Sequence, residues 1–343
     1  MKKLLNTLFV TLPDVVVNLE NENVCVKKDG EVLLRVPLLN LEGLVLFNYF
    51  GATHQLMGEC AKRNITVSFL SEHGRFIGSF YGGSKGNVLL RKEQFRISDD
   101  LLKSIGYAKN FVFGKLHNQK WVLERTLRDN ALRVNEERLK IESVYITESM
   151  KKLLQCDDMA TLRAIEGNAA HSYFKVFDEM ILRNKDSFIF TSRKRRPPTD
   201  PVNSLLSFAY TLLASECRHA LESVGLDSYV GFMHVERPGR ASLALDLMEE
   251  LRPHFADRFV ISQINLNEIV PSDFESQESG AVILSDEARK RFLTAWQKRK
   301  KEIITHPFLK EKLEWGIVPH TQALLLSRTI RGDLEQYPPF LWK

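Results

Sequence analysis

Cysteine is scarce in this chain, and long apolar runs are missing. The four cysteines among 343 residues lie far apart, at positions 25, 60, 156 and 217, and form no Cys-x-x-Cys pair. This spacing argues against a zinc ribbon and suits the reducing cytoplasm. No apolar run approaches the roughly 20 residues that a membrane helix needs, and Pro13-Asp14 ends the first apolar segment. We therefore expect a cytoplasmic protein without a signal peptide or a membrane partner.

Several catalytic signatures are absent as well. The sequence contains no Gly-x-Ser-x-Gly turn, no His-Glu-x-x-His motif and no phosphate-binding loop with its lysine. What it does contain is an ordinary globular composition, 44% hydrophobic and 27% charged, with a net charge of +5. This mildly basic balance permits an anionic partner but does not require one.

The hydrophobic pattern changes near residue 87. Before it, short runs rich in valine and leucine alternate with turn signals such as Asp29-Gly30, and one helix is expected over 53–64. After it, helical periods dominate. The polar, glycine-rich stretch 82–87 reads as a linker. We predict an α+β protein, with a small β-rich domain at 1–86 and a large, mainly α-helical domain at 87–343.

Several elements are predicted within the helical part. Helical periods run through 89–129 and 132–155, and further helices are predicted over 202–223, 242–251, 286–304 and 307–313. The polar segment 273–280 is expected to be a loop.

One of these helices carries a row of polar residues. Asp200 before Pro201 is a helix start signal. Asn203, Ser207 and Tyr210 then fall on one face, at i, i+4 and i+7. They are either satisfied polar groups of a capped core helix or groups beside a functional site or a nucleic-acid path.

A carboxylate interrupts an otherwise apolar helical stripe at Glu166. The stripe contains Met159, Leu162, Ala169, Tyr173, Val176 and Met180, at spacings of three and four. Burying an unpaired carboxylate costs several kcal/mol, so Glu166 should be paired, hydrogen-bonded or bound to a metal. Without a metal, Glu166 would either form a salt bridge with Arg163 or reach the edge of the core.

Further groups that can bind a metal follow downstream. His234 lies directly before a turn, and Asp246 and Glu249 are three residues apart on one face of the next helix. Taken singly, His234 could be an ordinary loop histidine, and the two carboxylates could form the solvated face of their helix. Together with Glu166, these groups could bind Mg²⁺ or Mn²⁺, and the imidazole shifts the preference toward Mn²⁺. Such a cation suits phosphodiester chemistry.

Basic residues cluster at three places. Arg193, Arg195 and Arg196 precede two prolines, Lys298 and Arg299 lie on a predicted helix, and Arg237 and Arg240 flank the turn after His234. A charge run is usually a solvated surface. Because guanidinium groups match the geometry of phosphate, these residues are candidates for binding DNA, and that binding should depend on salt.

Three segments, in order, resemble the CRISPR-associated integrase family, the metal-dependent DNA endonuclease-integrases of CRISPR adaptation. They are RAIEGNAAHSYF, RRPPTDPVNSLLSFAYTLL and GFMHVERPGRASLALDLMEELRP. Their order and spacing are similar to the family's, as is the division into a β-rich and a helical domain. The C-terminal stretch HTQALLLSRTIRGDLEQYPPF looks like the branch that accompanies subtype I-C systems.

The resemblance implies the following expectations. The metal ligands would be Glu166, His234 and a carboxylate of the helix at 242–251, where the family's one-turn spacing points to Glu249, with Asp246 near the site. A homodimer would form through the β-rich domains, and two dimers would hold a dimer of a small ferredoxin-like partner. The reaction would be a transesterification, in which a 3′-hydroxyl of a captured duplex attacks a phosphodiester of the repeat array. Branched DNA would also be cut.

Two other kinds of function stay open on the sequence alone. The chain could be a non-catalytic scaffold that binds nucleic acid, with its carboxylates in structural ion pairs. It could also be a metal phosphoesterase that acts on small molecules. Metal-dependent cleavage of branched DNA would separate the DNA integrase from the scaffold. Activity on mononucleotide esters, without affinity for DNA, would favour the phosphoesterase.

Overall fold

The computed structural model describes residues 6–71, 76–80, 82, 88–194 and 196–342. Most of the expected linker at 82–87 lies outside the described residues, and so does Arg195. The chain divides into two compact units, Met1–Lys85 and Gly86–Lys343. The first is rich in strands and the second is mainly helical, so the predicted α+β class is confirmed.

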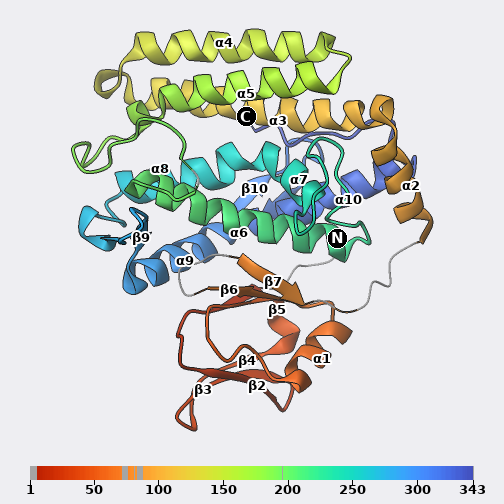
Figure 1. The fold of residues 1–343 in the computed structure, drawn as a ribbon, viewed down its shortest axis with the longest axis vertical. Helices are drawn as coiled ribbons and strands as arrows, with labels where there is room; N and C mark the ends of the chain where they lie inside the picture. Colours follow the sequence, from red (N-terminus) through yellow and green to blue (C-terminus); the bar gives the residue numbers. More distant parts are fainter. Residues whose placement is uncertain (1–5, 72–75, 81, 83–87, 195, 343) are drawn as a thin grey trace. The chain divides into compact units, whose positions relative to one another are not determined.

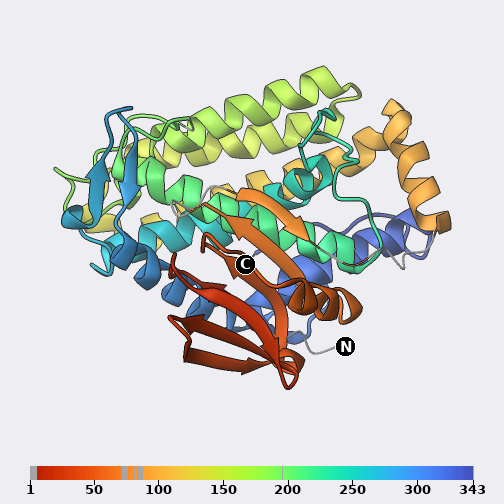
Figure 2. The same cartoon turned by 60° about the horizontal axis from the view of Figure 1, so that its bottom comes forward.

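The N-terminal unit contains two sheets and one helix. One sheet has the order β1-β5-β6-β7, in which β1, β5 and β6 are parallel and β7 is antiparallel to β6. The other is the antiparallel meander β2-β3-β4. Figure 2 shows both sheets with α1 nearby. The elements are β1 (Asn6–Val10), β2 (Val16–Glu20), β3 (Asn23–Lys28), β4 (Glu31–Pro37), β5 (Leu41–Leu46), α1 (His54–Lys62), β6 (Thr66–Leu70) and β7 (Phe76–Phe80).

Apolar side chains from both sheets and from α1 form one core. Val17 of β2, Leu44 of β5 and Leu56 of α1 are completely buried. The predicted turn between β3 and β4 is present at Asp29 and Gly30, whose φ values of 50° and 88° are both positive. Positive φ at both central residues is what a type I′ hairpin turn requires.

The second unit is built mainly from helices, with two short hairpins. Its elements are α2 (Val88–Asp99), α3 (Leu101–Asn130), α4 (Glu136–Gln155), α5 (Met159–Lys175), α6 (Pro201–Ser223), α7 (Ser242–Arg252), a π-helical turn (Pro253–Asp257), α8 (Arg258–Asn265), β8 (Phe274–Ser276), β9 (Val282–Leu284), α9 (Asp286–Lys300), β10 (Ile303–Thr305), β11 (Lys312–Glu314) and α10 (Val318–Ile330). In the described residues, no helix is both long and apolar enough to cross a membrane.

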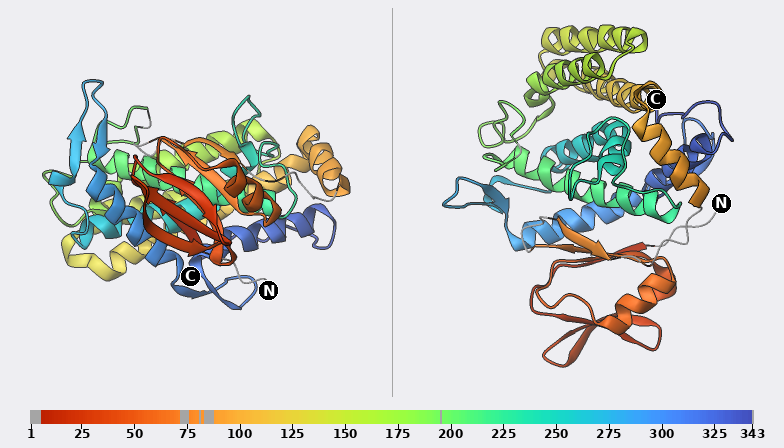
Figure 3. Two further views of the ribbon diagram at one scale, coloured as in Figure 1. Left: turned by 90° about the horizontal axis from the view of Figure 1, so that it is seen from below. Right: turned by 45° about the vertical axis from the view of Figure 1, so that its right-hand side comes forward.

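Helix α3 is central to this unit. It is 30 residues long and contacts α4, α5 and α7. Figure 1 shows α4 and α5 side by side, and the right-hand view of Figure 3 separates this pair from α6 and α7. The buried face of α3 is mostly apolar, but it also carries Lys115 and Asn118. These polar groups therefore lie between packed helices, where they need partners.

The helical period over 89–129 is interrupted. The side chain of Asp100 accepts hydrogen bonds from the backbone N–H groups of Leu102 and Lys103 and caps the start of α3. Such a cap stabilises a helix N-terminus, which explains why α2 and α3 are separate helices.

Near the C-terminus, the structure corrects several predictions. The segment 273–280 is not a loop throughout, because β8 pairs with β9. The helix predicted over 286–304 ends at Lys300, and 307–313 is not a helix. Instead, β10 pairs with β11, which buries Ile304 opposite Leu313. These strands have three residues each, so their apolar pattern is too short to predict a strand. Helix α10 was not predicted.

Candidate active site

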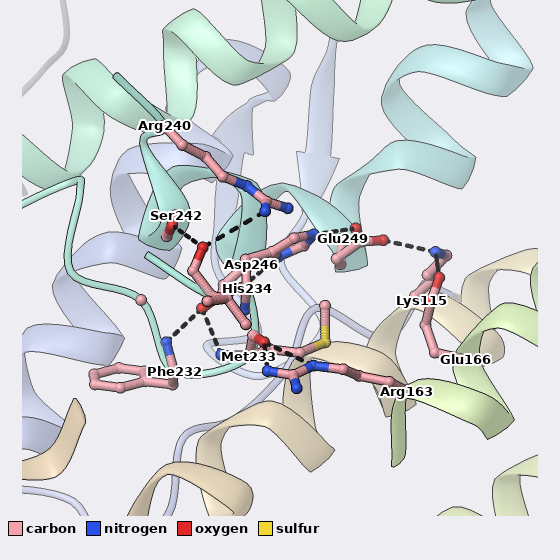
Figure 4. Close-up of polar contacts among 12 residues, drawn as sticks. Lys115, Arg163, Glu166, Phe232, Met233, His234, Arg240, Ser242, Asp246 and Glu249 are labelled. Atoms are coloured by element: carbon pink, nitrogen blue, oxygen red, sulfur yellow. Dashed lines mark hydrogen bonds and ion pairs between the residues drawn. The ribbon is translucent and has the colours of Figure 1, made fainter. Parts of the chain in front are cut away.

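Three helices and one loop bring the candidate site together. Helix α5 supplies Glu166, α7 supplies Asp246 and Glu249, the loop before α7 supplies His234, and α3 supplies Lys115. Figure 4 shows that these side chains point toward one another. Although far apart in sequence, they are linked by ion pairs and hydrogen bonds.

Lys115 is the group that joins the carboxylates. Its ammonium forms an ion pair with Glu166 Oε1 and lies 2.8 Å from Glu249 Oε2. Burial alone would lower the pKa of Lys115, but the carboxylates of Glu249 and Glu166 outweigh burial and raise that pKa. Lys115 is therefore a buried cation, and Glu166 pairs with it rather than with Arg163, which donates to the carbonyl of Met233.

Asp246 organises the loop that carries His234. Its carboxylate is completely buried and accepts from the backbone N–H groups of Phe232, Met233 and His234 at 2.6–3.0 Å. It also lies 2.6 Å from His234 Nδ1. With Nδ1–H donating to Asp246, the lone pair of the other ring nitrogen, Nε2, is free and lies 3.8 Å from Glu249 Oε1. Asp246 therefore fixes the tautomer and orientation of the imidazole.

Two glycines allow these close approaches. A Cβ at Gly231 would lie 2.8 Å from Asp246 Oδ2, and a Cβ at Gly114 would lie 2.7 Å from the Cβ of Glu250. Both distances are too short for a real side chain. Gly231 thus lets the loop close over Asp246, and Gly114 lets α3 approach α7, which puts Lys115 beside Glu249.

Arg252 keeps Glu249 ionised. One guanidinium nitrogen lies 3.1 Å from Glu249 Oε1, one helical turn away on α7. Burial alone would raise the pKa of Glu249, but the charges of Arg252 and Lys115 more than offset it and hold this pKa at about 2. Asp246 and Glu249 are both buried, so the reading of them as a solvated helix face is wrong.

The donors suit a hard divalent cation, but Lys115 competes for the same place. Two carboxylates and one imidazole match the preferences of Mn²⁺ and Mg²⁺. Glu249 Oε2 is buried and accepts no hydrogen bond from the described residues; its partner is the ion-paired ammonium. Within the described part of the chain, no group of three or more His, Cys, Asp or Glu is arranged to hold an ion. Binding would therefore require Lys115 to move away.

The polar face of α6 holds an arginine. Asp200 caps the helix start at Pro201, as expected. Asn203 Oδ1 and Ser207 Oγ accept from the guanidinium of Arg193 at 2.7 and 3.0 Å. Among the described residues, neither Asn203 nor Ser207 forms a hydrogen bond with Glu166, His234 or Glu249. Both side chains position Arg193, which is a candidate for binding DNA.

Tyr210 links α6 to the site through Arg252. Its ring lies 5.2 Å from the guanidinium carbons of both Arg193 and Arg252, and its hydroxyl donates to Asp257 at 2.5 Å. Since Arg252 contacts Glu249, Tyr210 packs against a direct neighbour of the candidate ligand.

The remaining basic residues differ in their surroundings. Arg196, Arg237 and Lys298 are exposed, and Arg240 and Arg299 are half-buried. Arg240 lies on the loop that carries His234, and Figure 4 shows its side chain beside this loop. One guanidinium nitrogen of Arg240 lies 3.5 Å from the carbonyl oxygen of Val235. Arg237 and Arg240 thus belong to the loop that supplies His234.

Glu250, next to Glu249, anchors the C-terminal segment. Its completely buried carboxylate accepts from Tyr337 Oη, from Gln322 Nε2 at 2.8 Å and from the Phe340 N–H at 2.7 Å. Asn118 of α3 adds a bond to the Phe340 carbonyl at 2.7 Å. Glu249 therefore belongs to the candidate site, whereas the next residue, Glu250, binds the C-terminal segment.

Sequence reasoning missed Lys115 and Arg252. Lys115 carries the same signal that identified Glu166, a charge within an apolar helical stripe that here contains Ala108, Phe111 and Val122. Arg252 lies one turn from Glu249, at the spacing of an ion pair.

Comparisons with known proteins agree on one family. Residues 8–298 match the family described as CRISPR associated protein Cas1. The chain is 46% identical over 343 residues to a CRISPR-associated endonuclease Cas1 of Chlorobaculum tepidum, covering 100% of both chains. It is 40% identical over 343 residues to one of Moorella thermoacetica, again covering 100% of both.

Solved structures give the same result for the fold. A chain of a Cas6-RT-Cas1–Cas2 complex is 26% identical with a TM-score of 0.82, covering 100% of this chain and 36% of that one. A casposase bound to integration product is 22% identical with a TM-score of 0.82, covering 100% of this chain and 95% of that one.

Proposed function

This chain belongs to the Cas1 family of CRISPR-associated endonucleases, and we propose that it is a metal-dependent DNA endonuclease and integrase. In this proposal, it inserts captured DNA fragments into a CRISPR repeat array by transesterification, with a 3′-hydroxyl as the nucleophile. One observation carries the proposal: Glu166, His234 and Glu249 converge from three segments, and Asp246 holds the imidazole ready.

Glu166, His234 and Glu249 would hold Mg²⁺ or Mn²⁺. When bound, the cation would polarise a phosphoryl oxygen and stabilise charge that develops in the displacement. Glu249 supports this role because its pKa of about 2 keeps it ionised at neutral pH. Asp246 already accepts four hydrogen bonds, so it supports the site by orienting His234 rather than as a ligand.

The surrounding cations would handle the phosphates. Lys115 pairs with both carboxylates and, together with Arg252, balances their two negative charges. The ammonium of Lys115 would have to leave the carboxylates for a divalent ion to bind. Arg237 and Arg240, on the loop of His234, would contact the DNA backbone beside the reacting bond. Lys115 and the two arginines would act through their positive charge and their position, without forming a covalent bond to the DNA.

The test is cleavage of branched DNA by the intact protein and by Glu166→Ala, with Mn²⁺, with Mg²⁺ and with a chelator. We expect Glu166→Ala to abolish cleavage and strand joining but to keep DNA binding, since the phosphate contacts come from arginine and lysine. Glu236→Ala, an exposed carboxylate near the same loop, is the matched control. Cleavage that persists in Glu166→Ala, or in chelator, would disprove the metal site.

One observation favours the non-catalytic scaffold as a second candidate. Glu166 and Glu249 already form ion pairs with Lys115, which is what structural carboxylates do. The same assay separates the two, because a scaffold would bind branched DNA without cutting it under any metal condition.

The proposal extends to partners and to placement within the family. A homodimer formed through the N-terminal unit would assemble with a small ferredoxin-like protein, two dimers around one partner dimer. The similarity to a chain of a Cas6-RT-Cas1–Cas2 complex supports a Cas2 partner.

The C-terminal stretch at 320–340 favours the subtype I-C branch. The four free cysteines suit the cytoplasm. Neighbouring genes would test the branch.

A further inference from the structure

Three arginines gather around a cluster of aromatic rings beside the candidate active site. The guanidinium carbons of Arg125 and Arg258 both lie 5.2 Å from the ring centre of Trp121. That of Arg299 lies 5.1 Å from the ring centre of Trp315. We call Arg125, Arg258 and Arg299 the arginine cluster.

The aromatic rings hold the cluster together. His254 stacks on Trp315 with ring centres 4.7 Å apart, and Trp342 packs against both rings at 4.3 and 4.9 Å. Trp121 meets His254 edge-on at 5.1 Å. The arginines therefore project from a rigid base formed by α3, the π-helical turn, the segment after β11 and the C-terminal segment.

The cluster has more positive charge than its carboxylates offset. Arg125 pairs with Asp129, which also pairs with Arg128, and Arg299 pairs with Glu302. In the described residues, Arg258 has no carboxylate within 4.0 Å, and its hydrogen bond goes to His254 Nε2 at 3.4 Å. Burial, with repulsion from Arg125 and Arg299, lowers the pKa of Arg258 to about 10. An anion would relieve this repulsion.

Hydrogen-bond donors without a partner, and the exposure of two of the arginines, also favour an anion at this place. Since Arg258 donates to Nε2 of His254, Nδ1 carries the proton, and it has no hydrogen-bond partner in the described residues. The indole N–H of Trp342 is buried and likewise without a partner there. The side chains of Arg125 and Arg299 remain 39% and 30% exposed, so an anion can reach them.

The position of the cluster relates it to the site. Arg125 follows Lys115 by ten residues on α3, which is about 15 Å along a helix. Arg258 follows Glu249 along α7 and the π-helical turn, so both helices lead from the site to the cluster. Phosphates of one DNA strand are spaced by ~3.4 Å along the duplex axis, so 15 Å corresponds to roughly four nucleotides.

We propose that the arginine cluster binds a backbone phosphate of the DNA substrate, roughly four nucleotides from the bond that reacts. This inference rests on the proposed function, because it takes DNA as the substrate. It adds a second point of contact, which would fix the direction in which the strand leaves the site. Trp121 and the other rings act as the base on which the guanidinium groups are held.

The first experiment measures binding of the branched duplex to the full chain without divalent cation, as a function of salt. One phosphate contact contributes about 0.9 to the salt slope and about eightfold to affinity at 0.1 M salt. We expect Arg258→Gln and Arg125→Gln each to lose about that much. Arg128→Gln is the matched control, because Arg128 lies on the same helix, is exposed and pairs with the same Asp129.

The second experiment places single uncharged methylphosphonate linkages two to six nucleotides from the cleaved bond, on each side. In the wild type, a methylphosphonate about four nucleotides from the cleaved bond should weaken DNA binding by about eightfold. In Arg258→Gln or Arg125→Gln, the same methylphosphonate should not change the affinity. Three of the chain's four tryptophans are among the aromatic rings against which the arginine cluster packs, so DNA should also change the tryptophan fluorescence.

Each outcome decides something. If Arg258→Gln, Arg125→Gln and Arg128→Gln lose DNA affinity equally, the inference is wrong. It is also wrong if no methylphosphonate position loses its effect in Arg258→Gln or Arg125→Gln. Neither result would contradict the proposed cleavage of DNA. A wild type that neither binds nor cuts DNA would instead overturn the proposed function. If inorganic phosphate alone changes the fluorescence and DNA does not, the cluster binds a small anion and the inference is wrong. Should Arg258→Gln fail to fold, Arg125→Gln is still decisive, because Arg125 is more exposed.

Discussion

Replacing Lys115 by methionine tests the charge balance of the candidate site directly. Methionine keeps much of the length of lysine and removes the ammonium that pairs with Glu166 and Glu249. The side chains of Lys115 and Glu249 are 5% and 2% exposed, whereas Glu166 is 23% exposed. Removing one partner of a buried pair costs about 3–5 kcal/mol. Because Arg252 still contacts Glu249, we expect the lower end, about 3 kcal/mol.

The same variant should respond strongly to divalent cations. A loss of about 3 kcal/mol lowers the Tm of a domain this large by roughly 6–12 °C. Mn²⁺ at a hundred times its Kd restores about 2.7 kcal/mol, which is most of that loss. The wild type should gain less from Mn²⁺, because the ion must first displace the Lys115 ammonium.

The assay is thermal unfolding of the full chain, monitored by the circular dichroism signal of its helices, with and without Mn²⁺. Lys120→Met is the control, since Lys120 lies on the same helix and pairs with Glu124 at the surface, a pair worth less than about 1 kcal/mol. If Lys115→Met unfolds at the wild-type temperature, the buried ion pairs do not exist in solution. If it is destabilised but Mn²⁺ does not restore it, the ion pairs are real and the cation site is not.

Three further predictions concern the ligands, pH and assembly. Glu249→Gln should weaken Mn²⁺ binding by well over tenfold and Asp246→Asn by about 10–100-fold at most, as for a group that orients a ligand; a titration in which Asp246→Asn loses more would reverse their roles. Burial lowers the pKa of His306 to about 4, whereas its pKa in the unfolded chain is near 6.5. The unfolded state therefore takes up a proton first as the pH falls, so folding stability is highest above pH 6.5 and decreases toward pH 4. Urea unfolding at pH 7.5 and pH 5 should differ by about 2 kcal/mol more in the wild type than in His306→Asn; equal differences would contradict this. Light scattering should find a dimer for the intact chain and a monomer for a chain beginning at residue 87; a folded dimer without the N-terminal unit would show that dimerisation lies elsewhere.

The sequence predicted elements whose pattern is long and repetitive. The β-rich beginning, the long helices and the start of α6 at Pro201 follow from alternation, from a period of 3.6 and from the Asp-Pro cap. The hairpins β8–β9 and β10–β11 were missed because three-residue strands carry almost no periodic signal.

The site was predictable by residue type but not by its contacts. A charge in an apolar stripe identified Glu166, yet its partner came from α3, about 50 residues earlier in the chain. Periodicity shows which face of a helix is buried, but it does not show which helix covers that face. The separation of roles between Asp246 and Glu249 depends on which carboxylate the loop of His234 folds onto, and that is a property of tertiary structure.

The anchoring of the C-terminal segment by Glu250 affects how genetic data on this protein should be read. A deletion or a bulky fusion that disturbs Phe340 would expose a buried carboxylate whose neighbour along α7 is Glu249. Such an allele would resemble a catalytic mutant in a phenotypic screen, although it changes no group that contacts the reaction. Affinity tags are therefore better attached away from this end, and truncation alleles should be checked for folding before they are scored as loss of chemistry.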